Sequence, residues 1–129
     1  MMTEDSVDPR GWFALALRQL DAAAFGTFRD QYPKALSSLV SGCESLLDVG
    51  CGSSSPVRHA ERRPGRLVGV DAFQYSIDRS RAKGIHDDYV FSDILSIHER
   101  FPAKSFECVL ASDVIEHLEK PDGHLLIER

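Results

Sequence analysis

Four short apolar segments, separated by helical or polar stretches, constrain the fold of this chain more than any other feature of its sequence. They are residues 45–49 (SLLDV), 66–71 (RLVGVD), 88–92 (DYVFS) and 106–112 (FECVLAS). Helical patterns between and after them cover about 56–63, 73–83, 95–100 and 114–129. This alternation is typical of successive βαβ units and predicts an α/β fold, in which a parallel sheet carries helices on its faces.

The part before the first strand carries helical periodicity instead. One helix is predicted at residues 10–20, and a second apolar pattern, at residues 25–40, is interrupted by Pro33, which would kink it or start a new helix. A length of 129 residues suits one domain, with N-terminal helices at 1–42 and a βα core at 43–129. Because the final DGHLLIER stops in mid-pattern without a cap, we expect the single domain at 1–129 to be truncated.

Composition limits the classes of function. The formal net charge is −5 and the acidic residues are spread along the chain, which argues against an extended nucleic-acid surface. Apolar runs are far too short for a membrane span and the first residues are acidic, so a cytoplasmic protein without membrane partners is expected. The three cysteines match no zinc framework and are expected to be reduced.

The segment LLDVGCGSSSP, residues 46–56, turns from the first strand toward a helix. Gly50 and Gly52 permit positive φ and close approach of a ligand to the backbone. Ser54 or Ser55 can cap the following helix, and Pro56 suits its first turn. We therefore expect a cradle of free amides at the carboxyl edge of the sheet, where open α/β sheets bind ligands.

The acid that closes the second strand narrows the choice of ligand. Asp71 follows Gly50 by 21 residues, a spacing at which a carboxylate can accept both hydroxyls of a ribose. A dinucleotide fingerprint would have a third glycine where Ser55 stands, and Asp48 would repel a pyrophosphate. A nucleoside cofactor with an ammonium group fits better, and an NAD(P)-binding oxidoreductase domain is the weaker alternative.

Four ordered motifs, LLDVGCG, GVDAF, FSDIL and FECVLASDVIEHLEKPDG, resemble those of class I S-adenosylmethionine-dependent methyltransferases over residues ~40–129. The resemblance implies a Rossmann-like parallel sheet of about four strands in the order 3-2-1-4, with the C-terminal strands of the family fold missing. It also implies S-adenosyl-L-methionine as cofactor and S-adenosyl-L-homocysteine as product.

The same resemblance assigns roles to individual positions. It places Asp48, Gly50, Cys51 and Gly52 around the methionine part of the cofactor and Asp71 on the ribose. Further positions flank the adenine (Ala72, Phe73), accept from its amino group or lie beside it (Asp93, Ile94), and line the transferred methyl group (Ser112, Asp113).

Asp113, Glu116 and His117 stand at i, i+3 and i+4 and would share one face of a helix. They would then cap and pack that helix, or Glu116 or His117 would deprotonate the acceptor. A divalent metal bound by all three is the third alternative, suggested by the likeness of DVIEH to the cluster of RNA 3'-terminal ribose methyltransferases. The other histidines are expected to be solvated: His59, His86, His98 and His124.

The sequence thus predicts methyl transfer to a small-molecule or RNA-end acceptor, with this chain holding mainly the cofactor-binding half. A non-catalytic S-adenosylmethionine-binding fragment or interaction module is the alternative. The acceptor itself is not encoded in any motif. Since the fourth strand would leave an unpaired edge, a homodimer formed through that edge is also expected.

Overall fold

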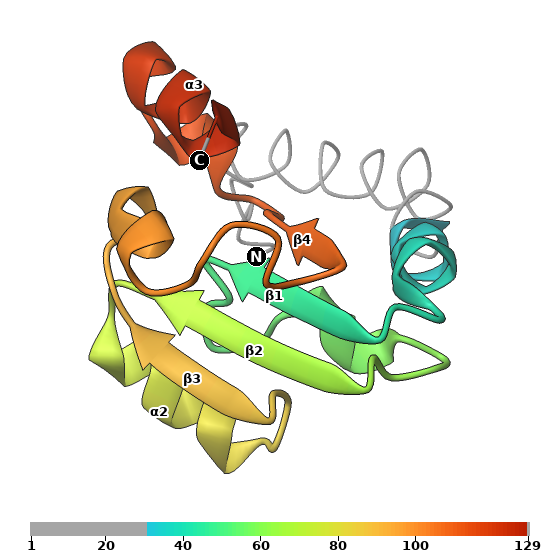
Figure 1. Cartoon of the computed structure of the whole chain (residues 1–129). Coiled ribbons are helices and arrows are strands. Elements are labelled where there is room, and N and C mark those ends of the chain that lie inside the picture. Colours follow the sequence, from blue (N-terminus) through green and yellow to red (C-terminus); the bar gives the residue numbers. More distant parts are fainter. Residues whose placement is uncertain (1–30, 129) are drawn as a thin grey trace, which may run out of the picture.

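The computed structural model describes residues 31–128 and contains a four-stranded parallel sheet (Figure 1). Its strands are β1 (Ser45–Val49), β2 (Arg66–Asp71), β3 (Asp88–Phe91) and β4 (Cys108–Leu110). Around them lie a helix at residues 31–40, α2 (Gln74–Ala82), α3 (Lys120–Glu128) and the 3-10 turns η1 (Pro56–His59), η2 (Ile94–Glu99) and η3 (Ile115–His117). The helix predicted at 10–20 lies outside the described residues.

The strand order is β3-β2-β1-β4 and every pairing is parallel, which confirms the predicted fold class and topology. Three strands begin at their predicted residues. The strand predicted at 106–112 is shorter, because β4 pairs only with β1 and only over Cys108–Leu110. The consequence for function is that all four strands point their carboxyl ends toward the same edge.

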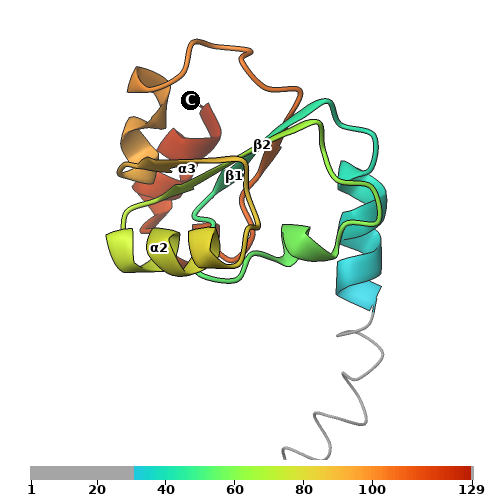
Figure 2. The same cartoon turned by 90° about the horizontal axis from the view of Figure 1, so that it is seen from below.

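The sheet is covered on both faces (Figure 2). On one face the residue 31–40 helix, η1 and α2 cover a core that includes Leu36, Leu46 and Leu67. On the other, η2 and α3 cover a second core, which includes Leu47 and Val70. Burial on both faces explains why β1 and β2 read as nearly continuous apolar runs.

Two predicted helices differ from the structure. The helix predicted at 56–63 is only η1, which Ser55 caps by accepting a hydrogen bond from the Val57 amide. The helix predicted at 114–129 is broken into η3 and α3 by an extended Leu118 (φ −96°, ψ 148°). Pro121 explains the break, since in a continuous helix its ring would clash with the carbonyl four residues earlier, whereas it suits a first turn.

The expectation of three reduced cysteines is wrong. Cys43, two residues before β1, forms a disulfide with Cys108 of β4, across 65 residues of sequence. Spacing within the sequence could not reveal this pair, because only the parallel register, which places Leu46 beside Cys108, brings the two together. No helix within residues 31–128 has the length and hydropathy needed to cross a membrane.

Candidate functional site

The turn after β1 has the predicted backbone conformation but not the predicted free amides. Gly50 (φ 68°) and Gly52 (φ 59°) are both left-handed. The Gly50 and Cys51 amides donate to the Val70 carbonyl at 2.8 and 3.0 Å, and the Gly52 amide donates to Asp71 at 2.8 Å. The prediction of free amides in this turn is therefore wrong, because the Val70 carbonyl and the Asp71 carboxylate of β2 already accept hydrogen bonds from these three amides.

Asp71 organises the site. It is buried at the end of β2, where one oxygen accepts from Gly52 and the other from the Phe73 amide at 2.9 Å. A carboxylate has about four acceptor positions, so both oxygens keep capacity for an external donor such as a hydroxyl. Asp71 thus fixes the turn and also presents acceptors at the carboxyl edge.

Asp48 is buried, and its carboxylate already has a hydrogen-bond partner within the protein. Its side chain is 2% exposed, and Oδ2 lies 2.7 Å from Nε2 of a fully buried His86. The expectation that His86 is solvated is therefore wrong; the tight turn between α2 and β3 directs its ring inward. His59, His98 and His124 are exposed, as predicted.

Cys51 lies between the two glycines and is buried as a free thiol. Burial, and then the nearby charges of Asp48 and Asp71, raise the pKa of Cys51 to about 12. Its thiol therefore stays protonated at neutral pH and is a poor nucleophile. In this site Cys51 acts as a small packing group.

The positions predicted to flank an adenine follow β2 and β3 at the same edge. Ala72 is exposed, and residue Phe73 is 71% exposed to solvent. Asp93 caps η2 by accepting from the Leu95 amide at 2.9 Å, with half-buried Ile94 beside it. An exposed aromatic ring and an exposed carboxylate therefore stand beside the ends of neighbouring strands.

The segment after β4 is not the continuous helix that the sequence predicts. Asp113 has a left-handed backbone (φ 56°) and does not cap η3, a single turn that carries Glu116 and His117. The predicted common helical face is therefore wrong. Within residues 31–128 no group of three acidic, histidine or cysteine side chains is placed to hold a metal ion.

Two contacts that hold the segments around the site together were not predicted from the sequence. The Tyr32 hydroxyl hydrogen-bonds the Ser112 hydroxyl, which joins the residue 31–40 helix to the end of β4. The Lys83 ammonium donates to the Ser53 carbonyl at 2.9 Å and so ties the end of α2 to the glycine turn. No motif marks either residue, since both contacts depend on tertiary packing.

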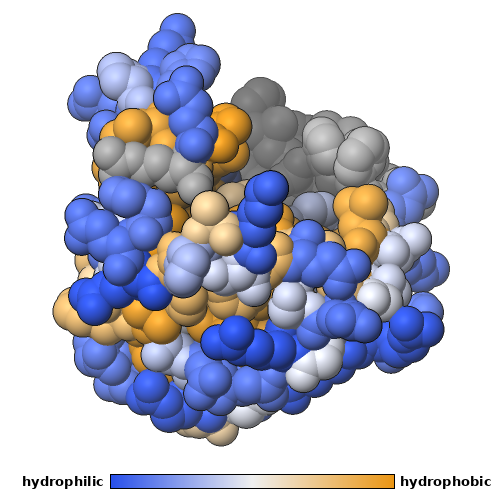
Figure 3. Space-filling view, in the orientation of Figure 1, coloured by the Kyte–Doolittle hydropathy of each residue, from blue (hydrophilic) through white to orange (hydrophobic). Residues whose placement is uncertain are grey.

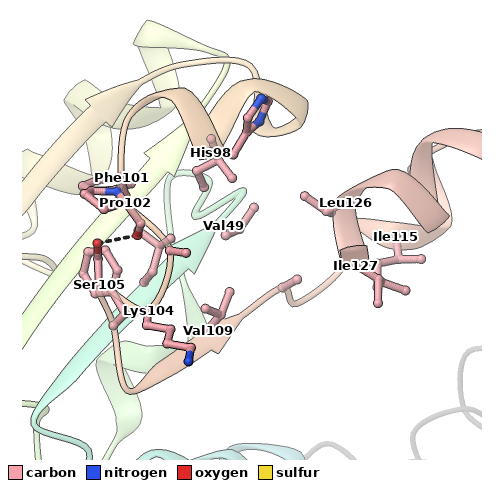
Figure 4. A pocket seen from close by; sticks show the side chains of 15 residues that line it. Val49, His98, Phe101, Pro102, Lys104, Ser105, Val109, Ile115, Leu126 and Ile127 are labelled. Atoms are coloured by element: carbon pink, nitrogen blue, oxygen red, sulfur yellow. Dashed lines mark hydrogen bonds between the residues drawn. The ribbon is translucent and has the colours of Figure 1, made fainter. Parts of the chain in front are cut away.

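An apolar cavity of about 470 Å³ lies between η2, β4 and α3 and borders the carboxyl edge, since Val49 at the end of β1 and Ala111 after β4 line it (Figure 4). Val49, Phe101 and Val109 line it from the sheet side, and Leu126 and Ile127 from α3. We call it the apolar groove. In the space-filling view, hydrophobic surface shows beside α3 and lower on the same face (Figure 3). None of the described residues that line the groove carries a carboxylate, so among them it lacks the acceptors that the carboxyl edge offers.

Comparisons with known proteins identify the family. The model of a family described as "Methyltransferase domain" matches residues 47–126. The ubiquinone biosynthesis O-methyltransferase of Bradyrhizobium diazoefficiens is 28% identical over 120 residues, which are 86% of this chain and 46% of that protein. The sterol 24-C-methyltransferase of Yarrowia lipolytica is 33% identical over 85 residues, 60% of this chain and 22% of that protein.

Solved structures share the fold. The N-methyltransferase NodS of Bradyrhizobium japonicum in complex with S-adenosyl-L-homocysteine gives a TM-score of 0.63 at 21% identity, covering 95% of this chain and 60% of that one. The magnesium protoporphyrin IX methyltransferase of Synechocystis with bound S-adenosylmethionine gives 0.60 at 16% identity, covering 77% and 51%.

The fold is that of a Rossmann-like α/β protein of the class I methyltransferase type. The chain belongs to the methyltransferase domain family, whose model covers more than half of it. It spans less than two thirds of the length of each of these relatives.

Proposed function

We propose that this chain binds S-adenosylmethionine at the carboxyl edge of its sheet and belongs to a protein that transfers the methyl group to an acceptor. The observation that carries the proposal is Asp71, which holds Gly52 and Phe73 by their amides while keeping acceptor capacity for ribose hydroxyls. A Cβ built on Gly52 would meet no atom of residues 31–128 within 4 Å, so this part of the chain leaves the backbone there open to a ligand. The residues present therefore fit the cofactor.

The remaining roles follow from position. Ala72 and Phe73 would flank the adenine, and Asp93 would accept from its amino group, with Ile94 beside it. The turn at 50–52 would hold the methionine part. When bound, S-adenosylmethionine supplies an electrophilic methyl group on a sulfonium. The chain's own contribution is to hold that donor in line with the acceptor, which accounts for much of the acceleration of such a displacement.

Ser112 and Asp113 would line the methyl group from the end of β4. Glu116 and His117 follow on the exposed turn η3, and either would take the acceptor's proton. Because Glu116 and His117 share no helical face with Asp113, we propose each as a candidate base by itself and not the three residues as one cluster. A small molecule or an RNA end would be the acceptor, in keeping with the net charge of −5.

The first prediction tests cofactor binding by calorimetric titration with S-adenosylhomocysteine. The wild-type chain is expected to show saturable binding, and Asp71→Ala to weaken it at least about 100-fold, because charge-assisted hydrogen bonds to the ribose and support of the turn are lost together. Asp88→Ala, at the exposed opposite end of β3, is the matched control and should bind as the wild type does.

Three results would contradict or redirect the proposal. Absence of binding by a folded wild-type chain would contradict it. Tight binding of NAD in place of S-adenosylhomocysteine would favour the oxidoreductase alternative. Binding without methyl transfer to any acceptor would favour the non-catalytic binding module.

A second prediction concerns the exposed strand edge. Among the described strands β4 pairs only with β1, and its Val109 is 66% exposed beside the apolar groove. We propose that a second copy of this chain pairs with β4, since an unpaired edge beside an apolar groove favours strand addition. Sedimentation should show a dimer that Val109→Lys dissociates. A monomer at high concentration would contradict the proposal.

A further inference from the structure

A row of three residues crosses the sheet directly behind the glycine turn. The parallel register places Asp48 of β1 opposite Gly69 of β2, and Gly69 opposite Tyr89 of β3. Residues that are paired in this way point to the same face of the sheet. Because the central residue has no side chain, the row has a gap between its carboxylate and its phenol.

The imidazole of His86 fills this gap. A Cβ built on Gly69 would lie 3.1 Å from the ring of His86 and 3.0 Å from Sγ of Cys51, so ring and thiol both rest on the glycine. Nε2 lies 2.7 Å from Asp48 and Nδ1 lies 3.1 Å from the Tyr89 hydroxyl. One side chain thereby bridges β1 and β3 across β2.

The hydrogen bonds around the ring orient it. The carboxylate of Asp48 can only accept when it is ionised, so Nε2 carries the proton and donates to it. At the other end Nδ1 is then an acceptor, with the Tyr89 and Ser80 hydroxyls 3.1 and 3.3 Å away. The Tyr89 hydroxyl accepts from the His86 amide at 3.2 Å and lies 2.7 Å from the Ser80 hydroxyl. Ser80 is fully buried in α2, so the network links that helix to the carboxylate.

We propose that His86 is a positioning residue for the cofactor site, which orients the Asp48 carboxylate beneath the turn that would hold the amino-acid end of S-adenosylmethionine. This inference rests on the proposed function. Cys51, the central residue of that turn, rests on Gly69 as the imidazole does, and it lies close enough to Asp48 for that charge to raise its pKa. His86 acts through Asp48 and touches no substrate atom.

The ligand pair that separates this role from a general structural one is S-adenosylhomocysteine and 5'-methylthioadenosine, since the second lacks the amino-acid end. His86→Leu is expected to weaken S-adenosylhomocysteine about tenfold and 5'-methylthioadenosine less than about twofold. His86→Gln, whose amide can donate to Asp48, should restore most of the affinity. Tyr89→Phe should show the same selectivity with a smaller loss, and it serves if His86→Leu does not fold.

A double-mutant cycle tests whether His86 acts through Asp48. In an Asp48→Asn background, His86→Leu should cause little further loss of S-adenosylhomocysteine affinity, because the carboxylate that it orients is already gone. The exposed His124→Gln is the matched control and should change neither affinity. Equal losses for both ligands, or additive losses in the cycle, would overturn this inference alone. Failure of the wild-type chain to bind S-adenosylhomocysteine would overturn the proposed function with it.

Discussion

Replacing Gly50 by alanine is expected to lower the free energy of unfolding by about 2–4 kcal/mol. Gly50 is left-handed, and a Cβ there would lie 2.4 Å from Cγ2 of Val114. Val114 is buried and β-branched, so it cannot move aside by changing rotamer at low cost. The variant should therefore push the segment after β4 away from the turn, and chemical denaturation would measure the loss.

Gly84→Ala is the matched control for this substitution. Gly84 has nearly the same φ, 64°, but an added Cβ would meet no atom within 4 Å among the residues that the structure describes. It should cost only the backbone strain, about 1 kcal/mol. Equal losses of unfolding free energy in the two variants would contradict this prediction, because they would show that the close approach of Val114 adds no cost at position 50.

The second large effect is expected on reduction of the disulfide between Cys43 and Cys108. The bond closes a loop of 65 residues and ties the edge strand β4 to the start of β1. Chain-entropy arguments give a stabilisation of about 4 kcal/mol for a loop of this length. Dithiothreitol should therefore lower the Tm of the wild-type chain by at least about 10 °C.

The double variant Cys43→Ser/Cys108→Ser is the control, because its Tm should match that of the reduced wild type and should not change when dithiothreitol is added. Thiol titration of the chain, unfolded without reductant, should count one reactive cysteine, Cys51. Three reactive cysteines would contradict the disulfide.

The sequence was sufficient to predict a parallel sheet, because the alternation of apolar and helical segments is a local pattern, whereas the strand order 3-2-1-4 followed from the resemblance to the methyltransferase family. Apolar runs mark β1 and β2 within the residues that the structure assigns, and glycines mark the turn. The resemblance to the methyltransferase family assigned the candidate positions at the strand ends, and the topology explains why they lie together, since parallel strands bring their carboxyl ends to one edge.

What the sequence could not show depends on contacts between distant residues. The partner of Asp48 is 38 residues away, and His86 has no motif of its own. The amides of the turn are satisfied by Val70 and Asp71, which only the pairing of β1 with β2 brings near. A closer reading of Gly69 would have been informative, because a glycine inside a buried strand often marks a close approach.

The central claim is that S-adenosylmethionine binds at the carboxyl edge, and a titration of the ¹⁵N-labelled chain with S-adenosylhomocysteine, followed by NMR, tests it most directly. We expect saturable shifts of the Gly52 and Phe73 amides, both of which donate to Asp71, and of Ile94, while Gly84 stays unchanged. Saturable shifts confined to the apolar groove, at Phe101, Val109 and Leu126, would contradict the claim, as would a folded chain whose spectrum does not change.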